Sequence, residues 1–221
     1  MIALAKEWNV VGAETTGKRA LTVRTPSELI ALRFDDTDNY FGDRILAAGQ
    51  PCTLLGPGGV GKSRLSLQLA VCTILGRDFL DMPTRVKGKK WLFVQTENSN
   101  RRLHYDLKNM VSALALDRDE MVKVDQNLFI HTLEQETDSF LNVLDPENYA
   151  AVNSLVQEVQ PEFVIWDPLN SFTCNDLNSD MDMRALVCAI SALTHAGNPN
   201  RVPLVLRSDW QNRCRACCGM G

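Results

Sequence analysis

The sequence predicts an α/β fold in which a mainly parallel central sheet lies between two layers of helices. Short apolar runs of strand length alternate with segments of helical periodicity, and one strand leads through a glycine-rich turn directly into a helix. The runs lack polar alternation, which is typical of strands covered on both faces. With 221 residues, 45% of them hydrophobic, the chain can form one domain with one sizeable core.

We expect residues 1–40 to be a weakly patterned lead-in that contains one short helix. Thr25 can cap that helix, Pro26 suits its first position, and Glu28 completes a capping box. The aromatic pair Tyr40-Phe41 precedes the first core strand. It can stack on a nucleotide base or pack against the core, and packing is the favoured interpretation.

The core elements are expected between residues 41 and 206. The expected strands are 52–55, 91–96, 128–133, 163–166 and 202–206. The expected helices are 62–75, 101–116, 146–159 and one more after the polar loop 170–180. The helix over 62–75 is apolar on nearly every side, so we expect it to be buried all round and to end at Gly76.

The segment between the first strand and the first core helix is GPGGVGKS, Gly56 to Ser63, which fits the pattern G-x-x-x-x-G-K-[ST]. A strand before it and a helix after it make it a phosphate-binding loop, although glycine-rich turns also occur without a ligand. Main-chain N–H groups and the helix dipole attract an anion there. Lys62 is expected to reach the β- and γ-phosphates of ATP, and the Ser63 hydroxyl to bind Mg²⁺. The expected nucleotide-binding residues are Gly56, Pro57, Gly58, Gly59, Val60, Gly61, Lys62, Ser63 and Arg64.

Two acids follow apolar strands, where the carboxyl ends of parallel strands line a ligand crevice. Asp167 follows the strand 163–166 and is expected to hold Mg²⁺ together with Ser63, directly or through water; otherwise it forms a turn before Pro168. Glu97 follows the strand 91–96 and is expected to orient and deprotonate the attacking water, with Lys62 as the second catalytic residue. The alternative is that Glu97 only caps the next helix.

These motifs together resemble the RecA-like P-loop ATPases, and within them the RepA-type replicative helicases and related AAA family ATPases. The resemblance covers roughly residues 40–206 and rests on the phosphate-binding loop, Gln95–Asn98 and Val164–Leu169. It implies that Lys62 binds phosphate, Ser63 and Asp167 hold Mg²⁺, and Glu97 is the catalytic base. It also implies a homo-oligomer, a hexameric ring with ATP between subunits, and single-stranded DNA as a possible partner. The loop 175–182 is acidic and would repel phosphates.

The chain departs from that family after residue 206, where the family has a Gly/Lys-rich loop, further strands and an arginine finger. Residues 207–221 are expected to form an irregular tail crowded with Arg, Trp and Cys. A one-base shift from Arg207 permits a Gly/Lys-rich sequence, so our hypothesis is a frameshift that truncated the chain. A zinc site at Cys214, Cys217 and Cys218 lacks a fourth ligand. Without an arginine finger, ATP hydrolysis would be slow.

Composition and charge narrow the function class. The net charge of −4 excludes a globally basic protein, so a nucleic acid would need a local patch. No run of eighteen apolar residues and no signal peptide is evident, which predicts a cytoplasmic location and no membrane partner. Cys52, Cys72 and Cys188 lie in apolar runs and are expected to be buried free thiols.

Three functions remain open. The favoured one is an ATPase that hydrolyses ATP to drive a DNA-associated process. A P-loop kinase would transfer the phosphate to a second substrate instead of water. A nucleotide-binding regulatory module, or an inactive remnant, would bind without turnover.

Overall fold

A computed structural model describes residues 22–33, 36–133 and 140–208, and the chain divides into two units, 1–35 and 36–221. The first unit contains α1 (Pro26–Ala31), which begins as predicted. The Thr25 hydroxyl accepts from the Glu28 N–H at 3.3 Å, and the Glu28 carboxylate accepts from the Thr25 N–H at 2.6 Å. The predicted capping box is therefore confirmed.

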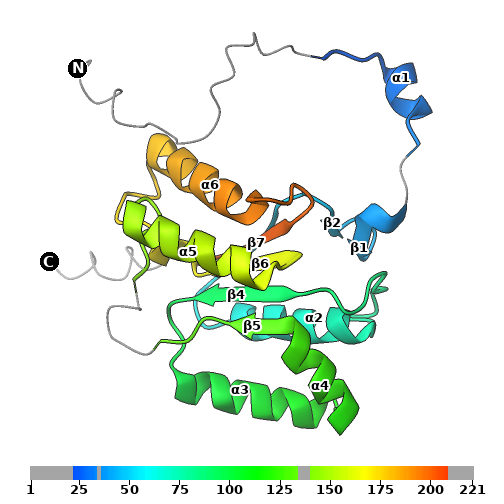
Figure 1. Ribbon diagram of the computed structural model, residues 1–221, viewed down its shortest axis with the longest axis vertical. Coiled ribbons are helices and arrows are strands. Elements are labelled where there is room, and N and C mark those ends of the chain that lie inside the picture. The colour runs from blue at the N-terminus through cyan, green and yellow to red at the C-terminus, as the bar shows by residue number, and fades with distance from the viewer. Residues whose placement is uncertain (1–21, 34–35, 134–139, 209–221) are drawn as a thin grey trace, which may run out of the picture. The chain divides into compact units, whose positions relative to one another are not determined.

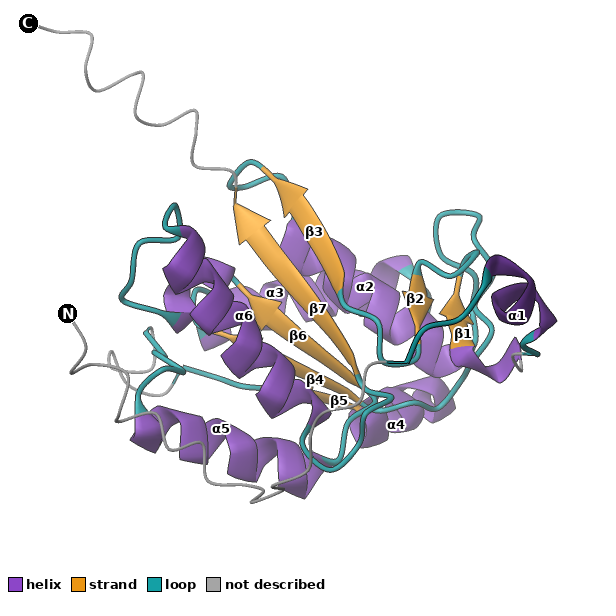
Figure 2. Ribbon diagram, turned by 90° about the horizontal axis from the view of Figure 1, so that it is seen from above, coloured by secondary structure: helices purple, strands orange, loops and turns teal. Residues whose placement is uncertain are grey.

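The second unit is built on a five-stranded sheet in the order β3-β7-β6-β4-β5, in which all four pairings are parallel. Its strands are β3 (Cys52–Gly56), β4 (Trp91–Gln95), β5 (Leu128–Ile130), β6 (Phe163–Asp167) and β7 (Val202–Ser208). The arrows of β3 and β7 lie side by side and point the same way (Figure 2). The predicted parallel α/β sheet is confirmed.

Helices cover both faces of this sheet (Figure 1). One face carries α2 (Lys62–Leu75), α3 (Asn100–Ala113) and α4 (Arg118–Asn127), and the other carries α5 (Pro146–Val159) and α6 (Asp180–His195). Along β4, Trp91 and Phe93 pack in the first core, whereas Leu92 and Val94 pack in the second. Because successive strand residues face opposite sides, every residue of β4 is buried and the fold has three layers.

The predicted aromatic pair lies in a small hairpin that the sequence did not predict. After the 3-10 helix η1 (Asp36–Asp38), β1 (Asn39–Phe41) pairs antiparallel with β2 (Leu46–Ala47). Tyr40 and Phe41 are both buried; Tyr40 meets Phe163 edge-on with ring centroids 5.3 Å apart. The packing interpretation is confirmed, and neither ring is available to stack on a base.

Helix α4 is the main element missing from the prediction. The expected helix 101–116 ends at Ala113, and a second helix begins after Asp117. Asp117 and Glu120 form a capping box, with the Asp117 carboxylate accepting from the Glu120 N–H at 2.8 Å. This Asp-x-x-Glu pattern was the signal that could have located α4.

Two strands of the sheet end more than one residue away from the expected end. β5 ends at Ile130 instead of residue 133, and β7 continues to Ser208 instead of ending at 206. β7 extends because its main chain stays paired with β3, with Leu55 opposite Arg207 and Gly56 opposite Ser208. The rest of the expected tail, residues 209–221 with its three cysteines, lies outside the described residues.

The burial of two segments also differs from expectation. The first turn of α2 is open, with Arg64 and Leu65 exposed, because it lies at the carboxyl edge of the sheet. Cys188 is exposed because it lies on the side of α6 opposite Leu186 and Ile190, whereas Cys72 is buried as predicted and Cys52 is half-buried. In the polar loop before α6, residues Leu169–Phe172 form the 3-10 helix η3. Among residues 22–33, 36–133 and 140–208, no helix has the length and apolarity needed to cross a bilayer.

Candidate nucleotide-binding site

The start of α2 differs from every other α-helix start that the structure describes. Its N-cap is Gly61, at φ 92°, and no side chain caps it. The other α-helices are capped by the side chains of Thr25, Ser99, Asp117, Asp145 and Ser179. The first-turn N–H groups of α2 have no intrahelical acceptor, so they are left for an anion at the positive end of the helix dipole.

The loop that leads into α2 borders open space. Gly59 and Gly61 have positive φ angles of 82° and 92°, which an L side chain adopts only with strain. A Cβ atom added at either position would meet nothing within 4 Å, and the Val60 side chain between them is exposed. The loop from Gly56 to Gly61 is therefore open at Gly59, Val60 and Gly61, where a ligand can approach the main chain.

The Lys62 ammonium crosses this loop from its far end. Its Nζ donates to the main-chain oxygens of Gly56 and Pro57, each at 2.9 Å. A cation therefore lies against the first two residues of the loop, and an ammonium there can pair with an anion that the loop binds. The Arg64 side chain, by contrast, pairs through Nε with Asp106 at 2.8 Å, and its main-chain N–H lies in the first turn of α2.

Asp167 lies at the carboxyl end of β6 and hydrogen-bonds with the Ser63 hydroxyl. It is 3% exposed, and its Oδ2 has no hydrogen-bond partner within the described part of the chain. The pKa of Asp167 is raised to about 6, chiefly because the carboxyl group is buried. The negative charge of Glu97 raises this pKa further, whereas the hydrogen bond from Ser63 and the positive charge of Lys62 lower it. A buried acid with one unpartnered oxygen therefore lies beside the phosphate-binding loop.

These oxygens fit Mg²⁺ better than a metal that needs a closed protein cage. Within the described residues, no group of three or more His, Cys, Asp or Glu side chains could hold a metal. Mg²⁺ is usually held by one or two protein oxygens, with phosphates and water completing its octahedron. Ser63 and Asp167 provide such a pair.

Glu97 lies at the same edge, one strand away from Asp167. β4 and β6 pair in parallel with Gln95 opposite Asp167, and the Thr96 N–H donates to the Asp167 main-chain oxygen at 3.1 Å. The Glu97 side chain is exposed and close enough to act on the pKa of Asp167. It does not cap α3, because Ser99 holds that position and accepts from the Arg102 N–H at 3.4 Å.

A fully buried glutamine, whose function the sequence analysis missed, holds the turn that carries Glu97. Gln95 Nε2 donates to the main-chain oxygens of Asn98 at 3.1 Å and His131 at 2.9 Å, and its Oε1 accepts from the Asn98 N–H at 2.7 Å. His131 Nδ1 hydrogen-bonds in turn with the main-chain oxygen of Gln95. His131 thus has a structural role beside Gln95. The available signal for Gln95 was a polar residue at the end of a buried apolar strand.

Comparison with known proteins agrees with this geometry. A search of curated proteins finds no match. A family model described as an AAA domain matches residues 10–198, which is most of the chain and includes the loop, Glu97 and Asp167. The chain therefore belongs to the AAA domain family, a family of P-loop ATPases.

Proposed function

We propose that this protein binds MgATP between the Gly56–Ser63 loop and the strand ends of β4 and β6, and hydrolyses it with Glu97 as the base. One observation carries the proposal: an uncapped helix start and two acids with different environments meet at one edge of the sheet. Asp167 is buried, whereas Glu97 is exposed. A buried oxygen beside the loop suits a cation, and an exposed carboxylate suits a water molecule.

The chemistry follows from those positions. Water attacks the γ-phosphorus, its proton passes to the Glu97 carboxylate, and the bond between the γ-phosphorus and the β–γ bridging oxygen breaks to release ADP and phosphate. The Lys62 ammonium and the loop N–H groups stabilise the charge on the phosphate oxygens as that bond breaks. Ser63 and Asp167 would hold Mg²⁺, which when bound would supply positive charge against the phosphates.

Glu97→Gln tests this function. It removes the base and keeps the side chain's size, so we expect ATP turnover to fall about 10²- to 10⁴-fold while ATP affinity is retained. Release of phosphate and binding of a fluorescent ATP analogue measure the two effects. Glu158→Gln, at an exposed position on α5, is the matched control and should match the wild type. Unchanged turnover in Glu97→Gln would exclude Glu97 as the base.

The same assay separates the two alternative functions. A P-loop kinase would form a phosphorylated second substrate, so little free phosphate would appear until that substrate was added. A regulatory module or an inactive remnant would bind ATP without turnover, and Glu97→Gln would then change nothing. Equal release of ADP and phosphate from ATP alone supports the ATPase.

We further propose that the ATPase works as a ring oligomer on DNA. The support is the resemblance of the phosphate-binding loop, Gln95–Asn98 and Val164–Leu169 to the RepA-type replicative helicases. Light scattering with and without ATP tests for a ring, and turnover with and without single-stranded DNA tests for coupling. A monomer under both conditions, with turnover indifferent to DNA, would contradict this part of the proposal and leave the ATPase assignment intact.

A further inference from the structure

The Asp106 carboxylate on α3 pairs with an arginine in the first turn of α2 and with an arginine in the first turn of its own helix, four residues before it. Asp106 Oδ1 accepts from Arg64 Nε at 2.8 Å, and Asp106 Oδ2 accepts from Arg102 Nε at 2.9 Å. The Asp106 side chain is 9% exposed, whereas the two arginine side chains are 55% and 56% exposed. The Asp106 carboxylate is thus held in place by its buried surroundings, and it orients the two more exposed arginine side chains.

Both anchored arginines lie next to residues of the proposed site. Arg64 directly follows Ser63 in the first turn of α2. Arg102 lies in the first turn of α3, five residues after Glu97. A single side chain therefore connects the helix that begins with the phosphate-binding loop to the helix that follows the catalytic base.

Apolar packing does not fill the space between the two helices at this level. A pocket of about 230 Å³ opens there, and it is lined by the polar Arg64, Gln68, Asp106 and Asn109 together with the apolar Met110, Ala113 and Leu114. Dense packing of side chains fixes the distance between two helices. Where a pocket interrupts that packing, polar contacts across it contribute more to holding the helices at that distance. The Asp106 bridge is such a contact.

We propose that Asp106 is a positioning residue that sets the placement of Glu97 relative to the phosphate-binding loop, through Arg64 and Arg102. The proposal rests on the proposed ATPase function. Hydrolysis needs the base and the bound phosphate in near-attack geometry, and small displacements reduce turnover strongly. ATP binding depends mainly on the loop itself, so a looser bridge affects the chemical step more than affinity.

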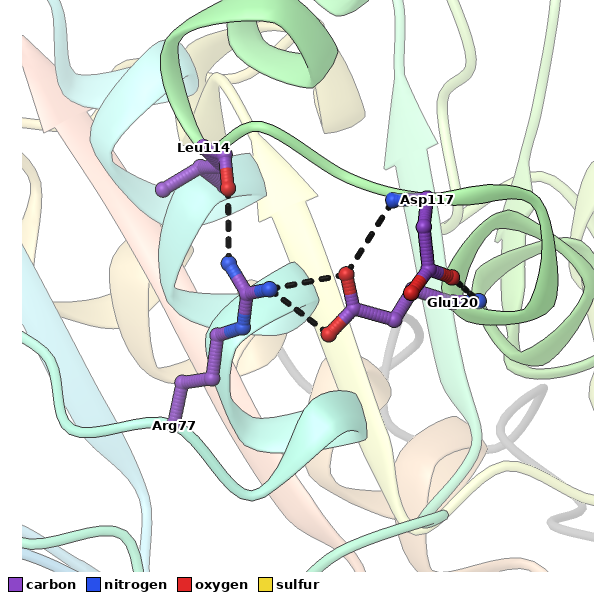
Figure 3. Close-up of polar contacts among 4 residues, drawn as sticks. All are labelled: Arg77, Leu114, Asp117 and Glu120. Atoms are coloured by element: carbon purple, nitrogen blue, oxygen red, sulfur yellow. Dashed lines mark hydrogen bonds and ion pairs between the residues drawn. The ribbon is translucent and has the colours of Figure 1, made fainter.

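A second ion pair, beyond the opposite end of α2, gives a matched control (Figure 3). Just after the C-terminal end of α2, Arg77 Nη2 donates to both Glu120 oxygens, at 2.6 and 2.7 Å, and Nη1 donates to the Leu114 oxygen at 2.8 Å. This pair ties α2 to α4, far along the helix from the loop. Glu120→Gln removes the same charge as Asp106→Asn and keeps an oxygen for the Asp117 N–H.

The experiment compares Asp106→Asn, Asp106→Glu and Glu120→Gln in steady-state ATP hydrolysis. Asparagine places an amide donor against a guanidinium, so one of the two arginine contacts is lost. We expect Asp106→Asn to lower kcat about ten- to a hundredfold with KM for ATP within about twofold. Asp106→Glu keeps the charge and should recover a large part of kcat, and Glu120→Gln should behave as the wild type. Equal kcat values in Asp106→Asn and Glu120→Gln would overturn the proposal.

A second measurement, hydrogen exchange, tests the role of Asp106 without depending on ATP turnover. Hydrogen exchange of the amides of residues 98–103 reports whether the segment after Glu97 is held in the nucleotide-free protein. We expect exchange there to be about tenfold faster in Asp106→Asn than in Glu120→Gln. If wild-type protein fails to hydrolyse ATP, the proposed function fails, whereas equal exchange in the two variants overturns the role of Asp106.

Discussion

The two ends of the parallel sheet differ in how their buried polar groups are satisfied. At the amino ends of β6 and β7, the Arg201 guanidinium is 1% exposed and donates to the Pro161 oxygen at 2.8 Å, to Gln160 Oε1 at 2.7 Å and to the Ala196 oxygen. At the carboxyl ends, Asp167 is buried as deeply, yet its Oδ2 has no partner in the described part of the chain.

This difference indicates that the buried charge at the amino edge, Arg201, stabilises the fold, whereas the buried charge at the carboxyl edge, Asp167, has an oxygen that a ligand can use. The Arg201 contacts satisfy main-chain oxygens just beyond the ends of α5 and α6, so the cation stabilises the packing of two helices. An unpartnered buried carboxylate destabilises the ligand-free protein, and a cation can relieve that cost. Changes at the amino edge should therefore alter stability, and changes at the carboxyl edge should alter function.

Among the changes that test this comparison of the two edges, Lys62→Ala should give the largest effect. It removes the cation from the phosphate-binding loop, and we expect turnover to fall about 10²- to 10³-fold, with ATP affinity also strongly reduced. The free energy of unfolding should change little, since Lys62 is only half-buried. Nucleotide titration and chemical denaturation measure both quantities, with Lys123→Ala on α4 as the control. Unchanged ATP affinity would contradict the assignment of the phosphate-binding loop.

Arg201→Met should give the opposite result. The main-chain oxygens of Pro161 and Ala196 lose a buried donor, so we expect the free energy of unfolding to fall by about 3 kcal/mol. ATP affinity of the folded protein should stay the same, because the change lies at the other end of the sheet. Denaturant unfolding checks this, and Arg118→Met, at an exposed position, provides the comparison. A selective loss of ATP affinity at unchanged stability would break the distinction between the two edges.

Asp167→Asn should give the smallest effect, and one that depends on pH. The pKa of Asp167 is raised to about 6 in the folded protein from its ordinary value of 3.8, so the folded state binds the proton more tightly. The metal-free wild type should then lose on the order of 2–3 kcal/mol of stability as the pH rises from about 4 to about 6. Asp167→Asn should lack this loss and be the more stable protein at pH 7. Denaturation midpoints from pH 4 to 8 test this, and parallel curves for both proteins would contradict it.

The elements that the sequence predicted are those whose signal is local. The Gly56–Ser63 loop carries its own pattern, and Glu97 and Asp167 each follow an apolar run. The carboxyl ends of parallel strands lie at the same edge of a sheet, and the phosphate-binding loop follows one of these ends. The two apolar runs therefore sufficed to predict that Glu97 and Asp167 lie near the loop. Their chemical difference, one buried and one exposed, could not be predicted, since it depends on what packs around each.

The parts that escaped prediction depend on contacts between distant segments. Asp106 meets Arg64 across 42 residues, and Gln95 meets His131 across 36. Neither contact produces a periodic pattern or a motif in the sequence from which it could have been predicted. The Asp117–Glu120 capping box that begins α4 is the exception, because its pattern is local, although no helix was predicted between residue 116 and the strand at 128.

The register between β4 and β6 also limits where residues can be inserted into or deleted from the chain. Gln95 lies opposite Asp167, so the offset between the two acids is counted in whole residues of about 3.3 Å each. Inserting or deleting one residue within either strand would move an acid by that distance and turn its side chain to the other face of the sheet. The connections outside the sheet, such as the largely exposed segment 174–179, carry no such constraint. Natural or engineered length variation should therefore accumulate in those connections, while β4 and β6 keep their lengths.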